Sequence, residues 1–158
     1  ATAIKNVARS EPQLARYLPG FPIHPSSLLV EGLAQTAGLV VAQHGDFQER
    51  VVLAKLSRAI FHQLARPGDT IRFEIEVQDI KPDGAICEGT AYIQQGKIAE
   101  VDMMFAHLDD RFAGNDLFEP VEFICLMRLM DMFKVGINPD GTPIKVPAHL
   151  LAAEQAGE

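Results

Sequence analysis

Residues 11–38 read EPQLARYLPGFPIHPSSLLVEGLAQTAG, and this segment constrains the fold more tightly than any other part of the chain. Within it, prolines recur at every third position: Pro19, Pro22 and Pro25. Each proline fixes its own φ and drives its predecessor out of the α region, so we expect a stiff, extended loop. Ser26 or Ser27 could then cap a helix that starts near Leu28.

The predicted helix runs from about Leu28 to Gln43 or His44, with Gly45 as its expected stop. It is apolar on nearly every side, which is typical of a buried helix, yet its first turns carry Glu31. A buried carboxylate is costly unless it is paired or functional, so Glu31 is the first candidate for chemistry. The alternative is an acid that is hydrogen-bonded to a loop for structural reasons.

Alternating apolar and polar residues predict strands around this helix. The clearest is 70–81, where Ile71, Phe73 and Ile75 alternate with charged residues. The predicted strands are 2–9, 51–55, 58–63, 70–81, 85–95 and 97–107. One helix and a meander of antiparallel strands indicate an α+β domain over residues 1–108, with the sheet wrapped around the helix.

The motifs of this domain resemble those of the β-hydroxyacyl-ACP dehydratases (FabZ/FabA type) of the hot-dog superfamily, over roughly residues 3–107. The shared positions, aligned without gaps, are Glu11-Pro12, Pro19-Gly20, Pro22, Pro25, Leu28, Glu31, Ala34 and Gln35, with Pro67-Gly68-Asp69 downstream. The resemblance implies a hot-dog fold, a role in fatty-acid biosynthesis and lyase activity on 3-hydroxyacyl thioesters linked to acyl carrier protein or coenzyme A.

Three positions depart from the family pattern. Tyr17 replaces the family's catalytic His, Ser26 replaces a Gly, and His24 stands where a Met is usual. The family's N-terminal segment, with its own short helix, is expected to be absent.

The resemblance also implies the site. In the resembled enzymes a His of one subunit acts as base and the helix carboxylate of the other assists the hydroxyl, so we expect a homodimer or a higher homo-oligomer. The candidate catalytic residues are Glu31, Tyr17 and His24, and the candidate substrate-binding residues are Ser26, Gln35 and Gly20. Gln35 follows Glu31 by one helical turn and could hold its carboxylate.

Tyr17 leaves the activity open. A phenol is mostly protonated at neutral pH and is a poor general base, although it can donate a hydrogen bond. Tyr17 could contact a ligand or merely fill the space of the missing His, and His24 could supply an imidazole. The alternatives to a dehydratase are an acyl-thioester hydrolase, in which the carboxylate activates water, and a non-catalytic module that binds acyl chains.

The composition narrows the class of protein. The 158 residues include 47% hydrophobic and 22% charged residues, with a net charge of −7, which opposes nucleic-acid binding. No apolar run is long enough to span a bilayer, and we expect a cytoplasmic protein. Cys87 and Cys125, like the remaining histidines, show no metal-binding spacing, so neither a metal nor a cofactor is expected.

Residues 109–158 form a C-terminal extension beyond the resemblance. A polar link over 109–116 precedes a helix that we predict from Pro120 to just before Gly136. The apolar stripe of this helix is too wide to stay in water, so the extension should pack on the same domain or on a partner subunit. A lid over an acyl pocket is the alternative, because Met-rich surfaces adapt to flexible ligands.

Overall fold

The computed structural model describes residues 1–94, 96–108 and 119–156. The chain divides into two compact units, Ala1–Leu108 and Asp109–Glu158. The elements of the first unit are β1 (Thr2–Asn6), α1 (Pro12–Tyr17), α2 (Ser26–His44), β2 (Arg50–Phe61), β3 (Thr70–Lys81), β4 (Gly84–Ile93) and β5 (Gly96–Leu108).

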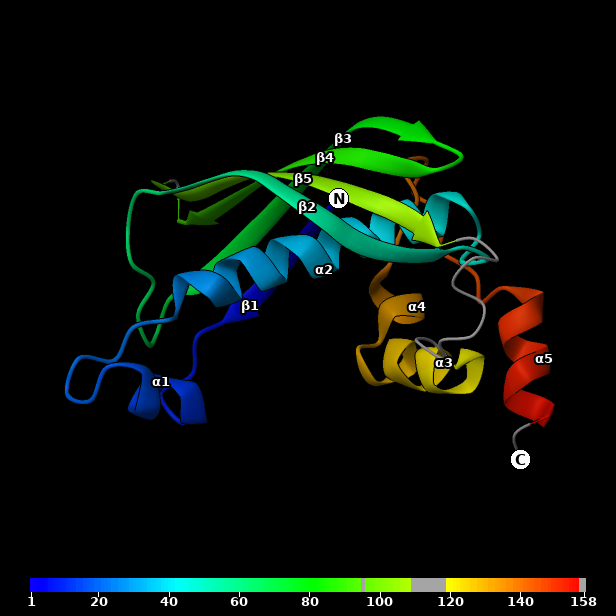
Figure 1. The fold of residues 1–158 in the computed structure, drawn as a ribbon. Helices are drawn as coiled ribbons and strands as arrows, with labels where there is room; N and C mark the ends of the chain where they lie inside the picture. Colours follow the sequence, from blue (N-terminus) through cyan, green and yellow to red (C-terminus); the bar gives the residue numbers. More distant parts are fainter. Residues whose placement is uncertain (95, 109–118, 157–158) are drawn as a thin grey trace. The chain divides into compact units, whose positions relative to one another are not determined.

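The strands described in the first unit form one antiparallel sheet in the order β1-β3-β4-β5-β2 (Figure 1). Helix α2 runs along one face of this sheet and contacts β2, β3, β4 and β5. A long helix held against an antiparallel sheet confirms the predicted α+β hot-dog fold. The strand predicted over 70–81 coincides with β3.

The core lies between α2 and the sheet. Leu29, Leu33, Ala37 and Val41 of α2 are buried, and their spacing of four residues places them on one helix face. The sheet contributes alternate residues of β3, β4 and β5, because side chains alternate between the two faces. These buried sheet residues include Ile71, Phe73, Ile75, Ala85, Cys87, Ala91, Val101, Met103 and Phe105.

The structure corrects the expectation that α2 is buried on every side. The sheet covers one side of the helix, so in a single chain Glu31 and Gln35 are exposed. Leu28, Val30, Leu39 and Val40 are only half-buried. Glu31 is therefore not a buried acid within one chain, and the apolar flank of α2 is incompletely covered.

Two local features of the structure also go beyond the sequence predictions. The strands predicted over 51–55 and 58–63 are one strand, β2, whose register against β5 shifts twice, between Leu53 and Lys55 and between Leu56 and Arg58. Helix α1, which precedes the proline-rich loop, was not predicted from the sequence. Pro12 begins α1, since proline is suited to the first helical turn, and the helix ends at Tyr17, before Pro19.

The second unit contains α3 (Pro120–Leu129), α4 (Met132–Val135) and α5 (Ala148–Ala156). The helix predicted from Pro120 onward is interrupted at Asp131, whose φ of 53° is left-handed. Arg128 on α3 pairs with both carboxylate oxygens of Glu154 on α5, each at 2.7 Å. The sequence did not predict α5, and the polar link over 109–116 lies outside the described residues.

The second unit exposes part of its apolar stripe. Ile124, Met127 and Leu150 are buried. Its exposed apolar side chains include Leu126, Leu129, Met130, Val135 and Ile137. Packing of this stripe on the first unit or on a partner, and its use as a lid, remain predictions. No helix in the described part of the chain combines the length and hydropathy of a membrane span.

Helix α2 lies very close to β3 at Gly32. A Cβ atom at Gly32 would lie 2.4 Å from Cζ of Phe73, which is much closer than van der Waals contact allows. At Gly38, on the same helix, a Cβ would meet Phe105 at an ordinary 3.6 Å. Absence of a side chain at Gly32 therefore lets the helix reach the sheet.

We expect Gly32→Ala to lower the free energy of unfolding by about 1–3 kcal/mol, because the methyl group displaces the Phe73 ring in a packed core. Gly38→Ala is the matched control, and it should be neutral or stabilising because alanine favours helix and fits the available space. Urea unfolding of both variants checks this. Equal stability of the two variants would contradict the close-approach explanation.

Candidate functional site

An open groove of about 540 Å³ lies beside the N-terminus of α2. It is formed between α1 and the start of α2, where α1 and the loop after it project from the sheet (Figure 1). The residues that line it are Pro12, Gln13, Arg16, Tyr17, Pro25, Ser27 and Leu28. The groove thus contains the one predicted catalytic residue, Tyr17, that replaces the family's His.

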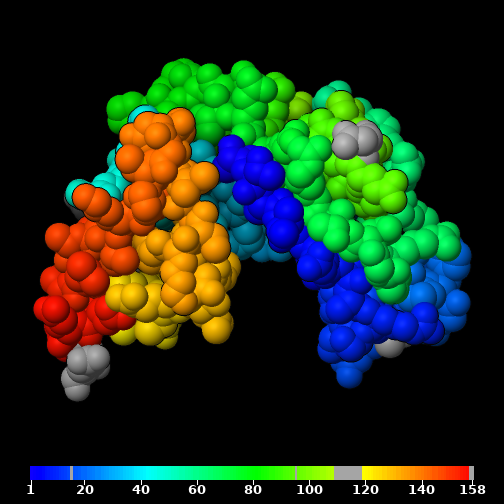
Figure 2. Space-filling model, turned by 180° about the vertical axis from the view of Figure 1, so that it is seen from behind, coloured from blue at the N-terminus to red at the C-terminus, as the bar shows by residue number. Residues whose placement is uncertain are grey.

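Helix α1 is held in place by a buried side chain and by the polar contacts of the residue that precedes it. Leu14 is buried in the core and anchors the helix. Glu11 accepts a hydrogen bond from the Ala8 N–H at 2.7 Å and pairs with Lys5 of β1 at 3.0 Å. In the reverse view, β1 runs across the surface toward the lobe that holds α1 (Figure 2). Tyr17 is 53% exposed.

Glu31 lies one helical turn beyond Ser27 on the same side of α2. Gln35 Nε2 donates a hydrogen bond to Glu31 Oε1 at 2.7 Å, so the helical spacing of these two residues orients the carboxylate. Glu31 does not line the groove in a single chain. Both side chains are exposed, and they are available to a ligand or to a second subunit.

The start of α2 differs in detail from the expectation. Neither Ser26 nor Ser27 caps the helix, because the helix begins at Ser26 and Pro25 occupies the N-cap position. The first helical hydrogen bond runs from the Leu28 N–H to the Pro25 carbonyl. The N–H groups of Ser26 and Ser27 therefore precede the helical ladder and point toward the end of the helix that carries partial positive charge.

Gly20 lies in the loop between α1 and α2 and is exposed. Its φ of +81° is in the left-handed region, which a glycine adopts without strain. Gly20 does not line the groove. Its contribution within one chain is to the course of the loop that follows Tyr17.

The structure places His24 away from the groove. The residue is only 1% exposed, its backbone N–H donates to the Ala65 carbonyl at 2.8 Å, and it does not line the groove. Neither ring nitrogen has a hydrogen-bond partner in the described part of the chain. Burial lowers the pKa of His24, and the charge of Lys5 lowers it further, whereas Glu11 and the Leu28 backbone act in the opposite direction.

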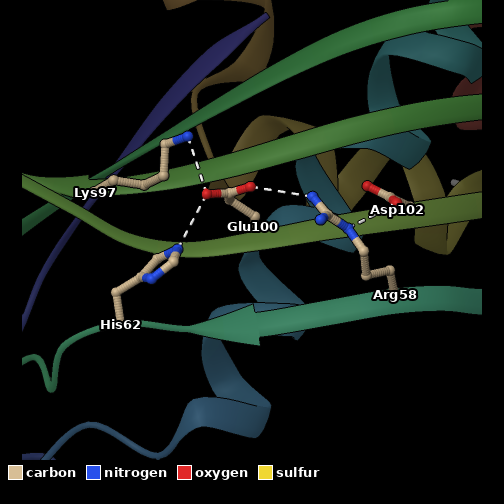
Figure 3. A network of polar contacts seen from close by, with 5 residues as sticks. All are labelled: Arg58, His62, Lys97, Glu100 and Asp102. Carbon is tan, nitrogen blue, oxygen red and sulfur yellow. Dashed lines mark hydrogen bonds and ion pairs between the residues drawn. The ribbon is translucent and has the colours of Figure 1, made fainter.

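A second polar cluster lies on the sheet face opposite α2 (Figure 3). Arg58 of β2 pairs with Glu100 and Asp102 of β5 at 3.1 and 3.0 Å, and His62 and Lys97 each lie 3.0 Å from Glu100. Lys97, then His62, lower the pKa of Glu100. These pairs connect strand β2 to β5, and we interpret the cluster as structural.

Sequence reasoning did not single out Arg16 and Gln13 as residues of this site. The available signal was the spacing of Gln13, Arg16 and Tyr17, which share one face if residues 12–17 are helical. Among the described residues, no group of three or more His, Cys, Asp or Glu side chains is placed to hold a metal ion.

Known proteins with similar sequences include dehydratases. A family model described as a FabA-like domain matches residues 1–102. The 3-hydroxyacyl-[acyl-carrier-protein] dehydratase FabZ of Pelotomaculum thermopropionicum is 34% identical over 107 residues, which is 67% of this chain and 76% of that protein. The FabZ of Pseudothermotoga lettingae is 41% identical over 98 residues, 62% of this chain and 69% of its own length.

Solved structures show the same fold. A mutant acyl-CoA hydrolase from Staphylococcus aureus in complex with coenzyme A superposes with a TM-score of 0.58 at 16% identity, covering 70% of this chain and 65% of that one. A Streptococcus mutans protein bound to acetyl-CoA gives 0.54 at 16% identity, covering 68% and 80%. At such low identity these likenesses concern the fold alone.

The fold and the comparisons together define a hot-dog protein of the FabZ-like type. The chain belongs to the FabA-like domain family.

The buried His24 predicts a specific pH dependence of stability. Because its pKa is lowered from 6.5 in the folded chain, the unfolded chain binds more protons at this position near and below that pH. The free energy of unfolding should therefore fall as pH drops from about 8 to about 5. Urea unfolding across this range should show the loss in the wild type and a smaller one in His24→Met, which carries no titrating group there.

The matched control is His44→Gln, because His44 is exposed at the end of α2. This variant should keep the acid-side loss. Burial raises the pKa of Glu11, but the Ala8 N–H and Lys5 outweigh burial and lower it below 4.5, so its contribution falls in a more acid range. Identical pH profiles for the wild type and His24→Met would refute the assignment to His24.

Proposed function

We propose that this protein is a dehydratase acting on 3-hydroxyacyl thioesters that are linked to an acyl carrier protein or to coenzyme A. The observation that carries the proposal is the groove at the N-terminus of α2, which is lined by Tyr17 and Ser27 and lies one helical turn from Glu31. The sequence relatives support this reading, since those described above are 3-hydroxyacyl-[acyl-carrier-protein] dehydratases.

The reaction requires three groups. A base removes the proton from C2, an acid protonates the leaving hydroxyl at C3, and hydrogen-bond donors stabilise the negative charge that develops on the thioester oxygen. The N–H groups of Ser26 and Ser27 at the start of α2 are suited to the last task, because the helix dipole favours negative charge there.

We assign the base to Glu31 and the acid to Tyr17. The Glu31 carboxylate takes the C2 proton while the Tyr17 hydroxyl gives its proton to the C3 hydroxyl. The C2–H and C3–O bonds break, a C2=C3 double bond forms and water leaves. The proton on Glu31 then passes to the Tyr17 phenolate, which restores both groups.

The other predicted site residues act indirectly in this proposal. Gln35 orients the Glu31 carboxylate through its hydrogen bond. Gly20 sets the course of the loop that carries Tyr17 toward α2. His24, which is buried and does not line the groove, acts as a positioning residue under that loop.

We further propose that the site is completed in a homodimer, with Glu31 of one subunit facing Tyr17 of the other. Glu31 does not line the groove of its own chain, and the adjoining flank of α2 is only partly covered. Strand β2 lies at an edge of the sheet, and its exposed apolar residues include Leu53, Leu56, Ile60 and Phe61. An exposed apolar edge strand favours pairing with a second copy.

The alternative function is an acyl-thioester hydrolase, in which Glu31 would activate water. One solved structure with this fold is an acyl-CoA hydrolase, so the fold is compatible with this activity but does not select it. A non-catalytic acyl-binding module is the third candidate. Assays with 3-hydroxybutyryl and crotonyl thioesters separate the three, since they give dehydration or hydration, release of free thiol, or neither.

We expect Glu31→Gln to lower kcat/KM for hydration of a crotonyl thioester by at least about 100-fold, because the amide can neither accept the C2 proton in dehydration nor return it to C2 in hydration. Tyr17→Phe should also lower the rate, whereas Tyr17→His should raise it, because an imidazole exchanges protons near neutral pH more readily than a phenol. The decrease in crotonyl absorbance measures the reaction.

The matched control is Glu88→Gln, which makes the same change at an exposed position of β4 and should leave kcat/KM unchanged. Full activity of Glu31→Gln would exclude the proposed role of the carboxylate. Release of free thiol by the wild type, with no hydration, would favour the hydrolase.

Sedimentation velocity at micromolar concentration should show a dimer for the wild type. Leu56→Lys should shift it toward monomer, because a charge on the edge strand opposes pairing. Ile86→Lys, at a similarly exposed position of the interior strand β4, should remain dimeric. A monomeric wild type would rule out a composite site.

A further inference from the structure

We infer that His24 controls the position of helix α1 through its own protonation. When the imidazole takes up a proton, the Glu11 carboxylate pairs with it and leaves the Ala8 N–H that it now accepts, so that α1 loosens and Tyr17 moves out of the groove. The conformational change stands on the contacts of His24 and Glu11, and its consequence for turnover rests on the proposed function.

The His24 ring is buried but not satisfied. The residue is 1% exposed, and neither Nδ1 nor Nε2 has a hydrogen-bond partner in the described part of the chain. His107, in contrast, pairs its Nδ1 with Glu49 at 2.9 Å. Folded proteins leave few buried polar groups without a partner, because such groups destabilise the folded state. The His24 ring is therefore a place where a change of charge can rearrange the contacts.

Two charged side chains act on the ring from opposite sides of its charge balance. Burial lowers the pKa of His24 below 6.5 and the Lys5 charge lowers it further, whereas Glu11 and the Leu28 backbone act to raise it. The ring is therefore neutral at pH 7 and takes up a proton on the acid side. The other charged side chains on the surrounding segments are Arg16 on α1, Glu31 on α2, and Arg66 and Asp69 in the loop before β3.

Glu11 is the anion with which a protonated His24 can pair. Its Oε1 accepts hydrogen bonds from the Ala8 N–H at 2.7 Å and from Lys5 Nζ at 3.0 Å, and its Oε2 accepts one from Gln13. Burial raises the pKa of Glu11, but the Ala8 N–H and Lys5 outweigh burial and lower it below 4.5. The carboxylate is consequently still ionised where His24 takes up its proton, and a buried imidazolium attracts it more strongly than a neutral N–H does.

The same carboxylate holds the start of α1, because Glu11 occupies the N-cap position of this helix. If Glu11 turns to His24, the Ala8 N–H and the Gln13 amide lose their acceptor, and the buried contact that remains is Leu14. A helix of six residues is too short to be stable without such contacts. Tyr17 is its last residue, so the loosened helix no longer fixes the phenol beside α2.

The change can be measured in the whole chain without turnover. The protein has two tyrosines and no tryptophan, so Tyr92→Phe leaves Tyr17 as the fluorophore. From about pH 8 to about pH 5, the acrylamide quenching constant of Tyr17 should rise about 1.5- to 2-fold, since a ring that is 53% exposed becomes almost fully exposed. Over the same range, the hydrogen-exchange protection factor of the Ala8 amide should fall by about 10-fold, in step with the NMR resonance of the His24 ring.

His24→Met in the same background should show neither change, because its side chain takes up no proton. Glu11→Gln should show no rise in quenching, since its amide can accept the Ala8 N–H but cannot neutralise an imidazolium. His44→Gln is the matched control, because His44 is exposed at the end of α2, and this variant should keep both changes.

Three results would overturn the inference. The first is an Ala8 amide that stays protected while His24 protonates, and the second is a His24 ring that stays neutral down to about pH 5. The third is a His24→Met variant that responds like the wild type. The first two are read in the wild-type sequence and need no variant to fold. Since no measurement requires dehydration, failure of the proposed activity would leave these results interpretable.

Discussion

Helix α2 can lie against the sheet because Gly32 presents no side chain to Phe73, where a Cβ atom would come within 2.4 Å of the ring. This close approach lets Leu29, Leu33 and Ala37 reach the buried residues of the sheet. The core of the first unit lies at this contact. Because protein cores are densely packed, the helix has little room to shift along the sheet. The position of the N-terminus of α2 follows from it.

The same contact decides which part of α2 remains available. The sheet covers one side of the helix, so the opposite side carries Glu31 and Gln35 into the open. An acid in this position incurs little desolvation within a single chain, and its neighbour one turn later orients it through a hydrogen bond. The helix thus supplies both the core and the exposed carboxylate.

The groove depends on how the segment before α2 folds. Buried Leu14 and the contacts of Glu11 with Ala8 and Lys5 hold α1 beside the start of α2. Tyr17 and Arg16 consequently project near the helix end that carries partial positive charge. A phenol and a guanidinium thus lie close to a carboxylate on the next helical turn. Together these groups can donate and accept protons and can bind a charged ligand.

The sequence by itself determined the elements whose patterns are strong: the alternation of β3, the apolar run of α2 with Gly45 at its end, and the matched Pro and Glu31 positions that identify the family. It did not determine α1, the continuity of β2, the break at Asp131 or α5, because short helices and bulged strands depend on their packing partners. Tertiary structure alone decided that His24 is buried and that Arg16 joins Tyr17 in the groove. Burial and proximity arise from contacts between distant segments, which local periodicity does not encode.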